Sequence, residues 1–399
     1  TDGEPASWPA FSRVAGELVI DRNTLDIRNA QGRLWGVELS KVNATIRELR
    51  KPVLKLDGEA RGPAADLLRY VNSSPVAGWT GNALRDTTAS GAAELKLALE
   101  LPIAELERST VQGTVQLAGN DVRLTRETPL LAAAKARISF SQKGFTVAGA
   151  TARVMGGEAT FDGGTQQDGG LRFNGQGVAT AEALRAASEL GALSRLAASA
   201  SGQTPYRLAL GFVRGRSEFT LTSPLTGLAL DLPAPLKKAA EDSWPLRVET
   251  RIAADGPLRD NLRIELSDVQ GPLQTHLLSA HYQRDLSRED GVPVVMRGAI
   301  GVQEAAPTLP ERGVQAVLAL GAVDGDAWDA VLDHAPAPGA AAGRAIRAAT
   351  DSGGYVPHVV ALRAQSIVSG GRRLNNLVLG VSQDAADGTW RGNIDAEQL

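Results

Sequence analysis

Two stretches of this chain, VAGELVIDRNTLDIR (residues 14–28) and VQGTVQLAGNDVRLT (residues 111–125), align at a constant offset. In both, apolar residues occupy alternate positions on either side of a short turn-forming segment. Because successive side chains of a β-strand point to opposite faces, this spacing places the apolar side chains of each strand on one face. Each stretch therefore predicts a strand, a tight turn and a second strand, with turns at residues 21–23 and 119–121. Two unrelated hairpins would give the same alignment, so an internal repeat and two independent hairpins both remain open as interpretations.

The same alternation returns along most of the chain, at residues 95–101, 137–141, 145–150, 158–161, 171–175, 206–212, 218–222, 246–252, 261–266, 277–283, 294–302 and 315–320. Helical spacing is rare. It predicts one longer helix near residues 180–200 and shorter ones at 63–71, 327–333 and 343–349. The sequence thus predicts a mainly β fold, largely an antiparallel meander with few helices.

The length of 399 residues is enough for about two or three domains. Residues 1–200 are predicted to form β modules that end in the longer helix, and residues 201–335 to form a continuing β module. A segment rich in Pro, Ala and Gly follows the histidine at 334. Residues 336–399 are therefore predicted to form a linker with a short helix and the start of another β module.

Composition excludes some functions and favours others. The formal net charge is −3, from 42 basic and 45 acidic residues without a long run of either sign, which argues against nucleic acid as a partner. Hydrophobic residues make up 43% but aromatic residues only 4%, so apolar surfaces are aliphatic. Such surfaces suit acyl chains, although an ordinary aliphatic core has the same composition. No apolar run of about 18 residues is present to cross a membrane. A start at Thr1 and an end in strand pattern predict a piece of a longer protein.

Residues that carry catalysis or bind metals are sparse. The chain has no cysteine and four histidines, of which His276 and His281 are spaced to lie on opposite faces of a strand. Asp324, Asp326 and Asp329 loosely resemble a calcium loop, but Trp328 stands where that loop needs an oxygen ligand. Asp324 or Asp326 is instead predicted to cap a short helix. We therefore expect no enzymatic activity, no metal site and no cofactor.

Several longer segments resemble one family over nearly the whole chain. SPLTGLALDLPAPLKKAAEDSWPLRV (residues 223–248), LDGEARGPAADLLRYVNSSPV (56–76) and GFTVAGATARVMGGEATFDGGTQ (144–166) are similar to YhdP-type members of the bacterial AsmA-like envelope family. ADGPLRDNLRIEL (254–266) and VALRAQSIVSGGRRLNNLVLGVSQ (360–383) show the same likeness. These motifs are long enough to identify a scaffold, but they contain no catalytic centre.

The resemblance implies an elongated antiparallel β-sheet curved into a trough or groove, in modules of the β-taco kind. It implies a segment of a periplasm-spanning bridge, anchored in the inner membrane outside this segment, that carries phospholipids between the inner and outer membranes. Acyl chains, both membranes and further envelope proteins would be the partners. The transport would support outer-membrane lipid homeostasis and the envelope barrier.

One apolar face per strand is predicted to line the groove. The candidate lining residues are Leu18, Ile20, Leu97, Leu99, Val115, Leu117, Leu208, Leu210, Leu228, Leu230, Leu262 and Ile264. Alternation shows which residues share a face within a strand, but it does not show whether that face meets lipid or protein. The alternative is a nonenzymatic scaffold whose apolar faces close into β-sandwich cores and whose polar faces bind protein partners.

Overall fold

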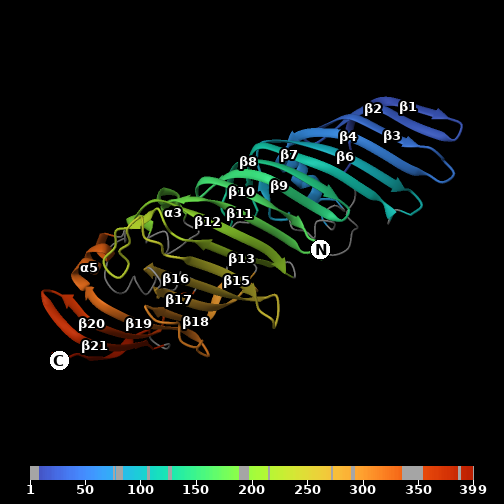
Figure 1. Ribbon diagram of the computed structural model, residues 1–399. Helices are drawn as coiled ribbons and strands as arrows, with labels where there is room; N and C mark the ends of the chain where they lie inside the picture. The colour runs from blue at the N-terminus through green and yellow to red at the C-terminus, as the bar shows by residue number, and fades with distance from the viewer. Residues whose placement is uncertain are drawn as a thin grey trace. The chain divides into compact units, whose positions relative to one another are not determined.

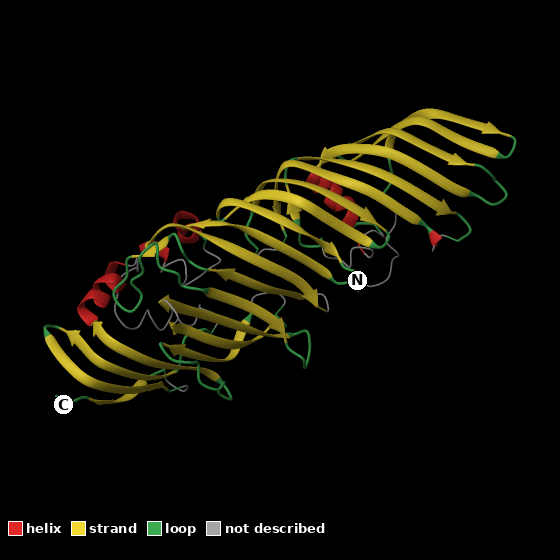
Figure 2. Ribbon diagram, viewed as in Figure 1, coloured by secondary structure: helices red, strands yellow, loops and turns green. Residues whose placement is uncertain are grey.

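The computed structural model describes residues 9–74, 77, 84–105, 108–124, 128–187, 197–213, 216–270, 273–288, 293–334, 354–384 and 388–398. Strands dominate these residues and the helices are short, so the predicted mainly β class is confirmed (Figures 1 and 2). The chain divides into two compact units, Thr1–Gly177 and Val178–Leu399. The boundaries predicted near residues 200 and 335 stay predictions, and most of the predicted linker lies outside the described residues.

The first unit is an antiparallel sheet whose strands follow one another closely in sequence order (Figure 1). Helix α1 (Ala64–Asn72) separates β4 from β5, close to the helix predicted at 63–71. The strands are β1 (Ser12–Asp21), β2 (Thr24–Leu34), β3 (Val37–Ile46), β4 (Val53–Pro63), β5 (Thr88–Ala89), β6 (Ala92–Pro102), β7 (Thr110–Arg123), β8 (Leu131–Ser141), β9 (Gly144–Val154), β10 (Gly156–Thr165) and β11 (Leu171–Thr180).

The second unit is also mainly antiparallel, but β19 pairs in parallel with both β18 and β20. Its strands are β12 (Ala200–Val213), β13 (Arg216–Ser223), β14 (Leu228–Leu230), β15 (Leu246–Ile252), β16 (Arg259–Gln270), β17 (Leu273–Asp285), β18 (Val294–Val302), β19 (Gly313–Asp324), β20 (Val359–Ser369), β21 (Arg372–Gln383) and β22 (Trp390–Asp395). Parallel neighbours need a connection that crosses the sheet, and residues 325–358, which include α5 (Gly325–His334), connect β19 to β20.

The two aligned stretches fold differently. The first is the β1–β2 hairpin, as predicted, with Leu18 paired to Ile27 and Ile20 to Leu25. The turn predicted at residues 119–121 is wrong, because β7 continues through it with register shifts around Asn120. The buried Asn120 amide donates to the carbonyl oxygens of Ser90 at 2.7 Å and Ala92 at 3.0 Å. These bonds stabilise a β-bulge where the sequence favours a turn.

The predicted helices have mixed outcomes. The helix predicted at 327–333 is α5, and Asp324 caps it by accepting a 3.0 Å hydrogen bond from the Ala327 N–H, as predicted. Of the longer helix predicted near 180–200, the structure describes α3 (Ala181–Ala186) and a 3₁₀ turn at Ala197–Ser199. Residues 188–196 and the helix predicted at 343–349 lie outside the described residues.

Aromatic side chains lie across glycines of neighbouring strands at several places in the sheet. Phe140 occupies the space that a side chain at Gly113 would fill, and Tyr282 does the same at Gly298. Each of these pairs is directly opposed in register. Cross-strand contact of this kind compensates for the missing glycine side chain and fixes the register.

Candidate functional site

In the first unit, strand register gathers the apolar side chains on one face, because directly opposed residues of neighbouring strands point the same way. One such row across β3, β4, β6 and β7 consists of Ala44, Leu56, Leu99 and Val111. A second row across β4, β6, β7 and β8 consists of Ala60, Leu95, Val115 and Ile138. We call the side of the sheet that carries these rows the apolar face of the first unit.

The opposite face of the first unit is polar and carries cross-strand ion pairs. Lys55 lies 3.3 Å from Glu100, and Glu59 accepts from Lys41 at 3.0 Å and lies 3.4 Å from Lys96. The hydrogen bond from Lys41 lowers the pKa of Glu59, and Lys96 adds to this effect. Exposed pairs of this kind contribute little stability. They do show that this side faces water, which leaves the apolar face as the candidate site.

Helix α1 covers one end of the apolar face of the first unit. It contacts β4, β5 and β6, and Val37, Ala60 and Ala93 are buried at this end. The helix is fixed by Asp66, which accepts from the Gly36 N–H at 3.2 Å, and by Arg69, which lies 4.2 Å from the centre of the Trp35 ring. Toward the other end, Leu54, Leu56, Leu99 and Leu101 are only partly buried. The unit thus retains an aliphatic surface that its own helix does not cover.

The second unit has an apolar face of the same kind. One row of register partners runs across six strands and consists of Leu208, Leu221, Val248, Ile264, Ala280 and Ile300. One end of this face is closed by Tyr355, which packs edge-on against Tyr282 with ring centres 5.1 Å apart. Leu262 and Val314 are buried in the same cluster.

A buried ion pair lies beside this closure. The Arg284 guanidinium binds both carboxylate oxygens of Asp260, at 2.8 and 2.5 Å, and donates to the Tyr355 hydroxyl at 3.0 Å. The Asp260 side chain is 4% exposed and that of Arg284 13%. Removal of two charges from water is costly unless both are paired and hydrogen-bonded, as they are here. The ion pair and Tyr355 are therefore joined by hydrogen bonds and together cover this end of the apolar face of the second unit.

Burial, with a smaller effect of Tyr355, raises the pKa of Tyr282 from 10.0 to about 12. Tyr282 ionises at a lower pH in the unfolded chain than in the folded protein. Between the two pKa values, 10.0 and about 12, the folded state therefore retains a hydroxyl proton that the unfolded state has lost. Its contribution to stability is complete below pH 10 and is lost as the pH rises toward 12. Between these pH values, we expect the free energy of unfolding of Tyr282→Phe to fall about 2–3 kcal/mol less than that of the parent protein. Urea unfolding at several pH values measures this difference. Parallel pH profiles of the two proteins would contradict this.

The structure places the predicted lining residues in three environments. Leu18 and Ile20 on β1 are 60% and 62% exposed. Partly exposed residues on the apolar faces are Leu97, Leu99, Val115 and Leu117 in the first unit and Leu208, Leu210 and Ile264 in the second. The chain itself covers the rest: Leu262 is buried near Tyr282, and Leu228 is buried with Leu230 beside it in a cluster with Ala181 and Ala200.

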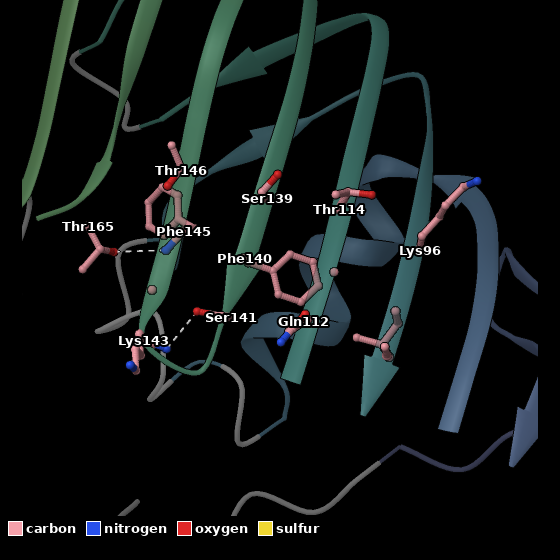
Figure 3. A pocket seen from close by; sticks show the side chains of 14 residues that line it. Lys96, Gln112, Thr114, Ser139, Phe140, Ser141, Lys143, Phe145, Thr146 and Thr165 are labelled. Carbon is pink, nitrogen blue, oxygen red and sulfur yellow. Dashed lines mark hydrogen bonds between the residues drawn. The ribbon is translucent and has the colours of Figure 1, made fainter. Parts of the chain in front are cut away.

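A surface hollow of about 660 Å³ lies over β6 to β9 in the first unit, with Thr165 of β10 at its border (Figure 3). Its described lining includes hydroxyl, amide and ammonium groups together with Phe140 and Phe145, and none of these lining residues is Asp, Glu, His or Cys. A general acid–base pair is therefore absent from its described wall. Nor do the described residues contain a group of three His, Cys, Asp or Glu side chains suited to a metal ion.

Sequence reasoning missed the closure by Asp260, Arg284 and Tyr355. A signal was present, because Asp260 and Arg284 stand two residues from Leu262 and Tyr282 and so share their face. Residues of opposite charge, at positions that alternation assigns to the apolar faces of neighbouring strands, indicate a buried ion pair. Tyr355 gave no such signal, since it precedes β20 and contacts Tyr282 over a long sequence separation.

No described helix is both long enough and apolar enough to cross a membrane. Comparison with known proteins gives a family match over almost the whole chain: the model described as "YhdP protein" matches residues 5–399. "Intermembrane phospholipid transporter YhdP" of Escherichia coli (strain K12) is 25% identical over 395 residues, which cover 96% of this chain. The chain spans 28% of the length of that relative. No solved structure matches.

Proposed function

This chain belongs to the YhdP protein family, and on that premise we propose that it is a lipid-conducting segment of an intermembrane phospholipid transporter. The observation that carries the proposal is the partly exposed aliphatic face in each unit, aligned in register across consecutive strands. Burial of apolar surface contributes about 25 cal/mol per Å² and requires no directional group. Such a face can therefore hold acyl chains of varied length without a specific pocket.

The wider role that we propose is that of a periplasmic bridge. The complete protein would be anchored in the inner membrane and carry phospholipid to the outer membrane, which would support lipid homeostasis and the envelope barrier. Further envelope proteins would meet the regions beyond this segment. The named activity of the Escherichia coli relative supports this role.

Photo-crosslinking in cells tests the proposal at single positions. A photoreactive amino acid at Leu99 or Leu117 of the full-length protein should give phospholipid adducts, detected by mass spectrometry, because these side chains are partly exposed on the apolar face. Gln116 is the matched control, since it is exposed on the same strand but points to the polar face. Adducts to protein only, or equal lipid yields at Gln116 and Leu117, would instead favour the scaffold alternative.

A further inference from the structure

One edge of the first unit brings together the turns of successive hairpins. The β1–β2, β3–β4, β6–β7 and β8–β9 turns share this edge because every second connection of an antiparallel meander returns to the same side (Figure 1). Backbone hydrogen bonds join neighbouring turns: the Leu49 N–H donates to the Asn23 carbonyl and the Ile103 N–H to the Pro52 carbonyl, both at 2.9 Å. These hydrogen bonds therefore fix neighbouring turns of this edge relative to one another.

These turns carry a surplus of positive charge. We call Arg22, Arg47, Arg50, Lys51 and Lys143 the basic rim. All five side chains are exposed, and none makes an ion pair with another described residue. A sixth basic side chain on this edge, Arg108, is paired with Glu105 at 2.9 Å, while Asp21 and Glu48 supply acidic groups nearby. At the opposite edge, the β2–β3 and β9–β10 turns, Trp35-Gly36 and Met155, carry no charge.

The basic rim adjoins the uncovered end of the apolar face. The row of register partners nearest to it consists of Ile20, Leu25, Ile46, Leu54 and Leu101. Ile20 is 62% exposed and the other four are partly exposed. Leu49 and Ile103, within the turns themselves, are also exposed. Cationic groups therefore border an aliphatic surface, an arrangement that matches an amphiphile with an anionic head.

We propose that the basic rim binds the phosphate of phospholipid headgroups while their acyl chains lie on the apolar face of the first unit. This inference rests on the proposed function and adds an orientation to it, with the headgroups along one edge of the sheet. Arginine and lysine are the usual phosphate ligands. The β1–β2 and β3–β4 turns, which carry four of the five rim residues, lie two strands apart, about 10 Å, which is close to the Debye length of about 8–10 Å. Their charges would thus act together on a headgroup at this part of the edge.

The test uses the purified chain and lipids with a photoreactive acyl chain, presented in vesicles of phosphatidylglycerol or supplied as diacylglycerol with the same acyl chains. The rim variant is Arg50→Glu/Lys51→Glu. The control variant, Lys135→Glu/Arg137→Glu, makes the same charge change on the polar face of β8, where both side chains are exposed. We expect the rim variant to lower the phosphatidylglycerol adducts about tenfold and to leave the diacylglycerol adducts unchanged. The control variant should resemble the parent protein.

Each other outcome has a distinct meaning. Equal loss in the rim and control variants would show a general charge effect and overturn the inference, as would unchanged phosphatidylglycerol adducts in the rim variant. Binding of inorganic phosphate to the parent protein but not to the rim variant, with phosphatidylglycerol adducts unchanged in that variant, would identify a site for free phosphate and also overturn it. Absence of adducts with both lipids in the parent protein would contradict the proposed function itself.

Discussion

Replacement of Asp260 by alanine is expected to lower the free energy of unfolding by about 3–5 kcal/mol. The substitution removes both carboxylate oxygens that hold the Arg284 guanidinium and leaves that charge buried. The Tyr355 hydroxyl also accepts a hydrogen bond from Arg284, but it is neutral and cannot replace an anion. Urea unfolding followed by circular dichroism, with the midpoint and slope compared with those of the parent protein, measures the loss.

An exposed pair in the same unit supplies the control. Arg259 and Asp255 lie 2.9 Å apart with side chains 47% and 54% exposed, so Asp255→Ala should cost less than about 1 kcal/mol. A double substitution, Asp260→Leu/Arg284→Met, should recover most of the stability lost in Asp260→Ala because it leaves no unpaired charge. If Asp260→Ala and Asp255→Ala have equal effects, the ion pair does not stabilise the closure.

Leu262→Asp should destabilise the second unit by about 4 kcal/mol, since it places a carboxylate in the cluster formed by Tyr282, Val314 and Ala280. Leu99→Asp should behave differently, because Leu99 is partly exposed on the apolar face of the first unit. That variant should stay folded and lose its phospholipid adducts. Thermal unfolding and crosslinking of the two variants side by side measure both effects.

Asn261→Asp is the matched control for Leu262→Asp, because Asn261 is exposed on the opposite face of the same strand. We expect it to change stability by no more than about 0.5 kcal/mol. A folded Leu262→Asp variant that had lost lipid adducts would mean that lipid reaches this residue, contrary to its buried position. The comparison therefore separates lining residues from core residues among those predicted from alternation.

Alternation predicted the strands well because it depends on local sequence alone. The strands predicted at 246–252 and 294–302 match β15 and β18 at both ends. It failed where local sequence permits two structures: Gly119 and Asn120 favour a turn, but contacts of Asn120 with Ser90 and Ala92 make a bulge. The parallel pairing of β19 was not predictable in this way either, since a strand has the same alternation whatever the direction of its neighbours.

The candidate site shows the same limit. Alternation placed Leu97 with Leu99 on one face of their strand and Val115 with Leu117 on one face of theirs, and the register brings both pairs to the same side of the sheet. Whether a face is covered depends on segments distant in sequence, and neither α1 over Ala93 nor Tyr355 near Leu262 follows from alternation. The basic rim did not follow from the sequence either, because its residues lie in separate turns and only the fold brings them to one edge.

The Phe140 ring that lies across Gly113 has a consequence for motion over the sheet of the first unit. A ring that leans over a neighbouring strand fills a gap there and projects less than one that stands upright, so the surface is less corrugated. For an acyl chain that moves over such a surface, the corrugation sets the free-energy barrier to each step of diffusion. Alanine at Gly113 would meet the Phe140 ring and also the backbone carbonyl oxygen of Lys96, so it would displace the ring, shift the neighbouring strand and slow lipid transfer by roughening the path.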